Sequence, residues 1–472
     1  METPASTVRW LEAVVGTVAD NQTDLAEPMQ SGWGAHASGV QCSASRRTLW
    51  RAISASQNGG PKRPGHKVVA GTAPKARGTR ALPFRLHRFG LDASALGSSA
   101  FPLLSTPLPD DSCSVGSAMH LAVRTDYPAG YTLVSPLEDA GWDERIRSFG
   151  EATIFHSAGW ARSLAEAYDH RPRYLVWREG RSERALGPVM ECGSWLERRC
   201  GVSLPFTDAC SLLTHSHGPT SSDMLAAALK VGEERRWSFY QWNTCEAVPN
   251  QEPSVTYRAH RINLASGSDA LFASLEGAAR RGVKKAQAHQ VVVEFLEGET
   301  GASEYYRLHC LTRQRQGQPP QPRRFFEALG RNVLILGRGF VAVARFQGRI
   351  VAAAVFLTFG TNAAYKYAAS DERFQHCRPG NLVLWERIRR LVAEGYRVLD
   401  LGRTSFDNEG LRRFKLGWGA EERLLFSYRV RVPDGTVIPL RDSAHAWHTR
   451  ILRHLPVPLL RLAGEIIYPF RI

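Results

Sequence analysis

The stretch from Leu411 to Ala420 has the sequence LRRFKLGWGA, and it decides the fold that we predict for this chain. It sets a phenylalanine beside a lysine, Phe414 and Lys415, near the end of a short helix predicted over about residues 409–415. A strand over residues 398–401 and a loop over residues 402–404 precede that helix, and a strand over residues 423–430 follows it. The chain therefore closes on a strand, a helix and a strand.

The residues before this stretch predict a meander followed by a helix. Three antiparallel strands are expected over 340–346, 349–359 and 363–370, because turn residues that include glycine separate the apolar runs. An amphipathic helix over 381–394 follows, and Gly395 ends it. Before the meander we expect a strand over 291–295 and helices over 268–289, 303–314 and 325–329.

Residues 131–260 predict a further region of helices and strands. Helices are expected over 154–168, with Ser157 as the cap, and over 223–236, with Ser222 as the cap. Strands are expected over 173–178, 186–190, 202–206 and 239–242. The predicted fold class is α+β.

Residues 1–118 are rich in Ser, Gly, Ala, Arg and Pro, and their apolar residues keep neither a helical nor a strand period. Such a segment buries too little apolar surface to offset its chain entropy. We predict a disordered, low-complexity basic tail that folding does not need, with Met119 as an alternative start of the protein. The competing interpretation is an arm that binds the phosphate backbone of RNA.

The charge and the cysteines limit the class of protein. Sixty Lys and Arg against 45 Asp and Glu give a formal charge of +15, which favours anionic partners such as phosphates, nucleic acid or an acidic membrane surface. No run approaches the roughly 18 apolar residues that a membrane helix needs, and the start shows no secretory signal. Eight scattered cysteines without a CxxC pair predict reduced thiols, and no common zinc spacing is present, so we expect no metal.

Four ordered blocks carry a resemblance to a known family: YKY at 365–367, Pro-Gly-Asn at 379–381, DLGR at 400–403 and FK-x-x-WG at 414–419. At these blocks the chain resembles the FemAB-like family, whose members consist of two tandem GNAT-like domains. The resemblance spans about residues 153–430. It implies a first GNAT-like domain over 125–265, a second over 266–435 that carries the transfer site, and a C-terminal extension over 436–472.

The resemblance also implies an activity. FemAB proteins move amino acids from aminoacyl-tRNA to the peptide of a cell-wall (peptidoglycan) precursor, and related GNAT-like proteins are predicted to use acyl-CoA. We therefore expect acyl or aminoacyl transfer to an amine, with the donor as a co-substrate and no permanently bound cofactor. The match places Phe414 and Lys415 beside the reacting carbonyl, where a fixed ammonium stabilises the developing oxyanion by roughly 3 kcal/mol. Arg403 is expected to point into the same cleft. The alternative for Lys415 is a solvated position on a helix turn.

The predicted donor site is the helix start at Arg378, Gly380 and Asn381, where GNAT enzymes bind the donor pyrophosphate through backbone N–H groups and the helix dipole. Here one glycine and a proline replace the usual glycine-rich loop, and the proline removes one N–H donor. This departure weakens the acetyl-CoA interpretation and is compatible with a tRNA-borne donor. The alternative is that Pro-Gly-Asn only starts a helix.

The predicted acceptor site is the basic cluster of residues 280–285. FemAB-like proteins bind an anionic acceptor, a nucleotide- or lipid-linked diphosphate, through basic residues, and Arg280 and Lys284 share one helix face. The alternative is a solvated basic face.

Alternation along a strand predicts that Tyr365 and Tyr367 point the same way, opposite to Lys366, and we assign the two tyrosines to substrate unless that face is core. The general base stays open among Asp208, Asp400, Asp407 and Glu409.

The run from Ile451 to Phe470 mixes leucines with arginines and is interrupted by Pro456 and Pro458. It fits either packing on the domain or peripheral contact with a membrane. We place the protein in the cytoplasm, at the inner face of the membrane if the acceptor is lipid-linked. The expected partners are an anionic envelope precursor or polysaccharide and, for an aminoacyl donor, tRNA; the oligomeric state is open. The rival hypothesis is a non-catalytic GNAT-fold protein that binds anionic glycans or RNA.

Overall fold

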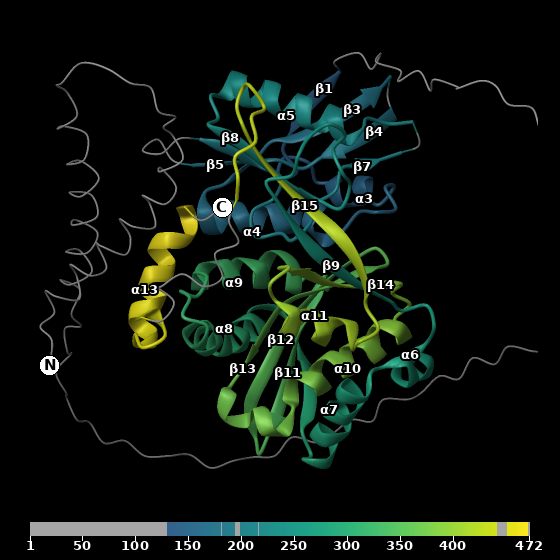
Figure 1. Ribbon diagram of the computed structural model, residues 1–472, viewed down its shortest axis with the longest axis vertical. Coiled ribbons are helices and arrows are strands. Elements are labelled where there is room, and N and C mark those ends of the chain that lie inside the picture. The colour runs from purple at the N-terminus through teal and green to yellow at the C-terminus, as the bar shows by residue number, and fades with distance from the viewer. Residues whose placement is uncertain (1–129, 181, 194–198, 216, 441–450, 471–472) are drawn as a thin grey trace, which may run out of the picture. The chain divides into compact units, whose positions relative to one another are not determined.

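The computed structural model describes residues 130–470 except 181, 194–198, 216 and 441–450 (Figure 1). The predicted disordered tail, residues 1–118, and Met119 lie outside the described residues. The strands are β1 (Tyr131–Val134), β2 (Arg171–Pro172), β3 (Tyr174–Glu179), β4 (Ser182–Gly187), β5 (Met190–Cys192), β6 (Cys200–Val202), β7 (Leu213–Thr214), β8 (Phe239–Thr244), β9 (Val255–Asn263), β10 (Val292–Leu296), β11 (Gly339–Phe346), β12 (Arg349–Phe359), β13 (Asn362–Ser370), β14 (Val398–Thr404) and β15 (Glu421–Arg431).

The α-helices are α3 (Trp142–Ile146), α4 (Ala158–Tyr168), α5 (Ser221–Arg235), α6 (Ser268–Ser274), α7 (Gly277–Ala288), α8 (Gly298–Arg315), α9 (Arg323–Leu329), α10 (Pro379–Ala393), α11 (Glu409–Leu416) and α13 (Val457–Ile467). Short 3₁₀ turns lie at η1 (Ile154–His156), η3 (Glu372–Cys377) and η4 (Tyr468–Phe470), and a π turn, η2 (Gly330–Leu334), follows α9. The chain is thus of the predicted mixed α/β kind.

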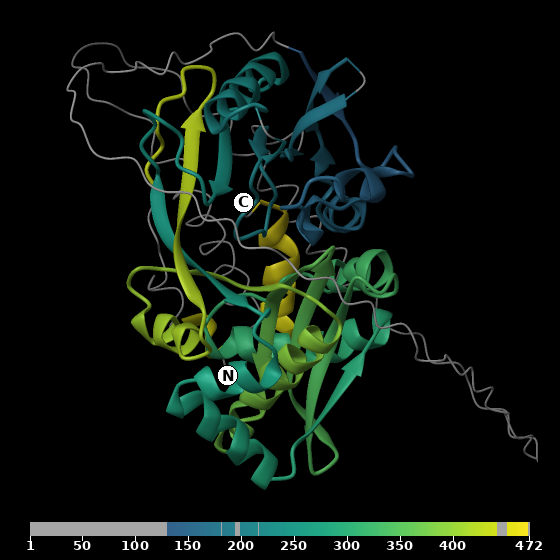
Figure 2. The ribbon, with the colours of Figure 1, turned by 90° about the vertical axis from the view of Figure 1, so that its right-hand side faces the viewer.

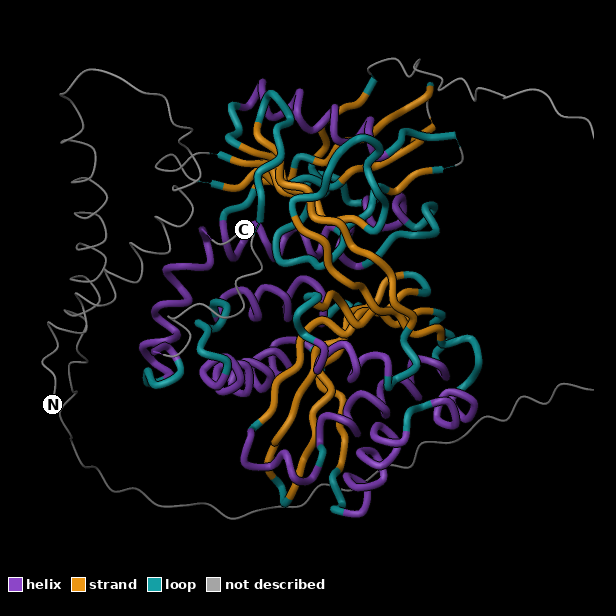
Figure 3. Tube along the Cα trace, in the orientation of Figure 1, coloured by secondary structure: helices purple, strands orange, loops and turns teal. Residues whose placement is uncertain are grey.

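A long mixed sheet holds most of the strands (Figure 3). Its order is β10-β11-β12-β13-β14-β9-β15-β8-β6-β5-β2, and a second, smaller sheet has the order β1-β3-β4-β7. β9 pairs antiparallel with both β14 and β15, and β15 continues onto β8, so that β9 and β15 run side by side in Figure 2. The long sheet therefore passes through the domain boundary predicted at residues 265 and 266. The predicted domain ranges stay predictions.

Helices cover both faces of the meander formed by β11, β12 and β13 (Figure 1). On one face, valines such as Val341, Val343 and Val355 pack against aromatic and aliphatic residues of α4, α8 and α9. On the other face, β11 and β12 present alanines at 342, 344, 352 and 354 to α10. Side chains this small let α10 approach the sheet closely.

Several local predictions were wrong. The helix predicted over 268–289 is two helices, because Leu275 takes an extended conformation and the Glu276 N–H donates to the Gly417 carbonyl (3.0 Å). The cap of α5 is Thr220, which forms a capping box with Asp223, and not Ser222. The strand predicted over 202–206 ends at Val202, and the predicted loop 402–404 belongs to β14.

The C-terminal helix α13 packs on the protein. Leu460, Ala463 and Gly464 face inward, and Gly464 lies against the Pro320 carbonyl. Arg313 donates to the Tyr468 hydroxyl (2.7 Å) just beyond the helix. These contacts favour the packing interpretation of this run. No helix in the described part of the chain is long and apolar enough to cross a membrane.

Candidate active site

The long sheet opens between β13 and β14. These parallel strands pair only along residues 362–364 and 398–400 in the described chain. Farther along, β13 stays paired with β12, and β14 stays paired with β9. Side chains from other elements meet in this opening.

A loop of the N-terminal part supplies the carboxylate in the opening. Asp208 lies between β6 and β7, and one of its carboxylate oxygens is 3.3 Å from Lys366 Nζ on β13. Its other oxygen is 3.6 Å from Arg403 Nε on β14. The loop also approaches the backbone of Gly402, whose φ is +72° and where an added Cβ would lie 2.7 Å from Asp208 Oδ2.

A bulge in β13 changes the direction of the YKY block. Val355 pairs with Tyr367 and the next residue, Phe356, pairs with Tyr365, so Lys366 is the extra residue. As a result Tyr365 packs with the core under α10, whereas Tyr367 packs with the core under α8 and α9. The prediction that the two tyrosines share a face was wrong, because simple alternation does not survive an inserted residue. Both rings lie in core packing; substrate contact by either stays a prediction.

Lys415 reaches the same opening from α11. Its ammonium donates to the carbonyls of Gly402 (2.8 Å) and Arg403 (2.9 Å), and the residue is only 5% exposed. It is therefore not the solvated residue of the alternative interpretation. Burial lowers the pKa of Lys415 to about 8, although Asp208 and Asp400 act in the opposite direction.

The electrostatics make Asp208 an anion at neutral pH. Burial raises its pKa, but the charges of Lys366, Arg403 and Lys415 outweigh burial and bring the pKa below the ordinary value for an aspartate. A carboxylate with a low pKa is a weak proton acceptor. Among the residues left open as a general base, Asp208 is the one that pairs with Arg403, a predicted catalytic residue, yet its environment suits a counter-charge better than a base.

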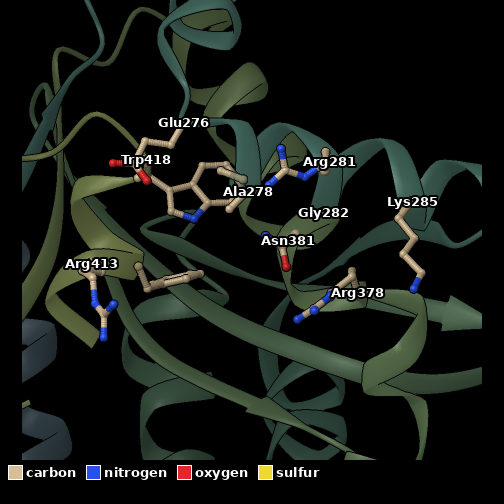
Figure 4. Close-up of a pocket in the computed structure, with 12 residues that line it drawn as sticks. Glu276, Ala278, Arg281, Gly282, Lys285, Arg378, Asn381, Arg413 and Trp418 are labelled. Carbon is tan, nitrogen blue, oxygen red and sulfur yellow. The ribbon is translucent and has the colours of Figure 1, made fainter. Parts of the chain in front are cut away.

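A second feature is a pocket of about 450 Å³ between α7, the start of α10 and α11 (Figure 4). It is rich in cations, and its lining residues are Glu276, Ala278, Ala279, Arg281, Gly282, Lys285, Arg378, Asn381, Arg413, Phe414, Gly417 and Trp418. Phe414 and Lys415 are thus neighbours on one helix that serve different places: Phe414 lines the pocket, and Lys415 enters the opening of the sheet.

Trp418 gives this pocket an unused hydrogen-bond donor. The side chain is 1% exposed, and its Nε1–H has no hydrogen-bond partner among the described residues. Figure 4 shows the indole nitrogen directed into the space between Asn381 and the α11 side chains. A buried donor without a partner is costly, so a ligand acceptor at this point would stabilise the pocket.

The predicted donor residues lie at this pocket, but the predicted acceptor residues do not. Arg378 and Asn381 line it, and Gly380 is in the first turn of α10 beside them. Arg281 and Lys285 line it in place of Arg280 and Lys284, and Arg280 donates instead to the Ala273 carbonyl (3.2 Å).

Gly282 is the feature of the sequence that could have distinguished Arg281 and Lys285, which line the pocket, from Arg280 and Lys284, which do not. An added Cβ there would lie 2.6 Å from Asn381 Nδ2, so the glycine marks the side of α7 that faces α10.

The structure also brings together a cysteine and a histidine whose contact could not be predicted from their spacing in the sequence. Cys210 Sγ lies 3.5 Å from His156 Nε2, and both residues are buried. Burial lowers the pKa of His156 to about 4 and raises that of the Cys210 thiol. Neither group is in the form that nucleophilic catalysis requires. Within the described residues, no three His, Cys, Asp or Glu side chains are grouped to hold a metal ion.

The comparisons agree with this architecture. A model of the acetyltransferase (GNAT) domain matches residues 274–422, which hold the pocket, the opening and Lys415. Among solved structures, FemX superimposes with a TM-score of 0.50 at 12% identity, over 63% of this chain and 96% of FemX. Residues 274–422 therefore form a GNAT acetyltransferase domain, which is the domain of an N-acyltransferase, whereas at 12% identity the likeness to FemX shows the fold alone.

Other solved structures also align with this chain. A tandem GNAT protein from the clavulanic acid biosynthesis pathway aligns at 10% identity over 64% of this chain and 98% of its own, with a TM-score of 0.41. L-PGS from Bacillus licheniformis aligns at 9% identity over 69% and 97%, with a TM-score of 0.40. No curated protein sequence matches the chain. At these identities the likeness concerns the fold.

Proposed function

We propose that this protein transfers an acyl or aminoacyl group from a phosphate-bearing donor to an amine of an anionic envelope precursor or polysaccharide. The observation that carries the proposal is the placement of α11. One turn of this helix sets Phe414 in the cation-rich pocket and Lys415, a buried ammonium, in the opening of the sheet. A donor held in the pocket would thus have a cation close to its reactive end.

The pocket is suited to the phosphates of such a donor. Arg281, Lys285, Arg378 and Arg413 contribute four cationic side chains, and the start of α10 adds its dipole. Acyl-CoA and aminoacyl-tRNA both carry phosphates beside a nucleoside, and either fits this chemistry as a co-substrate. Pro379 at the first position of α10 means that side chains, more than backbone N–H groups, would hold the phosphates.

The transfer step needs a positive charge near the carbonyl. A neutral amine attacks the donor carbonyl carbon, a C–N bond forms, and the oxygen becomes an oxyanion before the C–S or C–O bond to the leaving group breaks. The amine loses its proton to solvent or to the leaving group. Lys415 is the proposed stabilising cation, because a preorganised donor in a dry site is worth roughly 3 kcal/mol at this stage. Its two carbonyl contacts fix it in place.

Paired arginine variants test the donor site. Arg281→Ala should weaken binding of the donor by about 10- to 100-fold, because it removes a charged contact. Arg280→Ala is the matched control from the same helix, and it should leave binding unchanged. The assay would measure transfer of a labelled group from acyl-CoA and from aminoacyl-tRNA to envelope precursors. Equal effects of the two variants would argue against this pocket as the donor site.

The acceptor and the location belong to the same proposal. The formal charge of +15 favours an anionic acceptor, and the family resemblance suggests an envelope precursor made in the cytoplasm. The rival function, binding of anionic glycans or RNA without chemistry, predicts retention of these ligands but no labelled product in the same assay.

A further inference from the structure

We infer that Asp208 is a positioning residue for the transfer reaction: its carboxylate holds Lys366 and Arg403 across the opening of the sheet and supplies the counter-charge that keeps Lys415 cationic. This role of Asp208 in the reaction rests on the proposed function. It assigns to the N-terminal part of the chain a role in a site whose other members come from β13, β14 and α11.

The loop that carries Asp208 is fixed on both sides of this residue. The Cys210 N–H donates to the Asn243 carbonyl (2.9 Å), and the Trp242 indole donates to the Cys210 carbonyl (2.8 Å). The Asn243 amide donates to the Thr207 carbonyl (3.5 Å). These bonds tie residues 207–210 to β8 and therefore direct the Asp208 side chain toward the opening.

The carboxylate joins the two strands that do not pair there. It contacts Lys366 at the bulge of β13 (3.3 Å) and Arg403 on β14 (3.6 Å). The Lys366 side chain is 6% exposed, and its ammonium lies over the Phe155 ring (5.4 Å from its centre), so it has little freedom to take another position. Ion pairs at this spot replace the backbone ladder as the connection between β13 and β14.

The charges around Lys415 show why the carboxylate matters. The charged and titratable groups around Lys415 come from the loop, β13, β14, β9 and β15. They are Asp208, Lys366, Asp400, Arg403, His260 and Glu422.

Asp400 also raises the Lys415 pKa, but its carboxylate is shared with Arg261 (3.3 Å). His260 bonds to Glu422 (3.2 Å), and burial lowers its pKa, so that it is neutral at pH 7. Without Asp208, three cations would share the opening with no carboxylate of their own.

Titration of Lys415 in the full chain tests the inference without any donor. In protein carrying ¹³C-labelled lysine, NMR should show that Asp208→Asn moves the Lys415 titration to lower pH by about one unit, because a nearby negative charge favours the ammonium. Gly402→Ala, which displaces the carboxylate without removing it, should move it in the same direction. Asp371→Asn, which breaks an ion pair with Arg373 just beyond β13, is the control and should leave Lys415 unchanged.

The same variants should also change the pH dependence of the transfer rate. The ammonium fraction of Lys415 falls as pH rises, so the transfer rate should fall through the Lys415 pKa, and this fall should occur at lower pH in Asp208→Asn. Asp208→Glu, which keeps the charge, should restore the wild-type profile in part. An unshifted Lys415 titration in folded Asp208→Asn and Gly402→Ala would overturn the inference. Full activity of Lys415→Ala would instead overturn the proposed function and leave the titration result standing.

Discussion

Gly402 is the residue that lets the loop with Asp208 approach β14 closely. Its φ of +72° lies in the left-handed region, and its missing side chain leaves room for Asp208. Gly395, which ends α10, has a similar φ of +83° but no neighbour within 4 Å of an added Cβ. Alanine at Gly395 would therefore introduce backbone strain alone, whereas alanine at Gly402 would introduce strain and also contact the Asp208 carboxylate.

Alanine at each glycine should give different results. Both Gly402→Ala and Gly395→Ala should destabilise the fold by about 1 kcal/mol or more, because alanine is strained at positive φ. Only Gly402→Ala should also lower the transfer rate, because it displaces Asp208. Thermal unfolding and the rate at saturating donor would measure both effects. Equal rates in the two variants would show that the approach of Asp208 to Gly402 has no part in the reaction.

Residues in local motifs were predicted better than residues that meet through the fold. The resemblance assigned Phe414 and Lys415 to the site, and the structure adds that Lys415 is buried at the opening. Asp208 remained one of four carboxylates, because its contact with Lys366 joins residues 158 positions apart. The bulge at Lys366 was not predictable, since pairing with β12 creates it.

At the scale of elements, turns and caps determined what could be predicted. The meander was predicted closely, because Gln347 and Gly348 both have positive φ and form the tight turn between β11 and β12. β9 was missed although it lies between β14 and β15. Its sequence, VTYRAHRIN, carries two arginines and a histidine, and its pairing partners lie more than 130 residues away.

The cap of α5 gives an element-scale prediction. Thr220→Ala should destabilise the protein by about 1 kcal/mol, because the hydroxyl accepts from the Asp223 N–H and belongs to a capping box. Ser222→Ala, at the position first expected to be the cap, should change the unfolding free energy by less than about 0.5 kcal/mol. Urea denaturation compares them. A larger loss in Ser222→Ala would contradict the observed helix start.

At the scale of the whole molecule, α13 extends the packed core. Tyr468 lies in the same core as α8 and α9, and Glu465 meets Arg324 (3.6 Å). Gly464 is the residue where the helix approaches Pro320, and an added Cβ would overlap the carbonyl oxygen. Exposed glycines inside helices behave in the opposite way, since alanine there raises helix stability.

The sign of a glycine substitution therefore tests whether α13 docks as described. Gly464→Ala should lower the melting temperature, because the methyl group forces the helix away from Pro320. Gly410→Ala in α11, where the nearest atom is 3.8 Å from the added Cβ, is the control and should raise it slightly or leave it unchanged. A higher melting temperature in Gly464→Ala would mean that α13 is not packed on the protein.

The N-terminal 118 residues provide a second whole-molecule prediction. Their composition cannot supply a sizeable core, so a chain starting at Met119 should unfold at the same temperature as the full chain. Differential scanning calorimetry measures this directly. A lower melting temperature after truncation would show that folding needs these residues.

The central claim is that Lys415 stabilises the oxyanion of an acyl-transfer reaction. The most direct measurement is the single-turnover rate of labelled group transfer by Lys415→Met, with Arg412→Met on the same helix as the control. We predict that Lys415→Met lowers this rate by about 10²- to 10³-fold and that Arg412→Met, whose side chain pairs with Glu422 (2.7 Å), retains it within a few fold. A wild-type rate in folded Lys415→Met would contradict the claim.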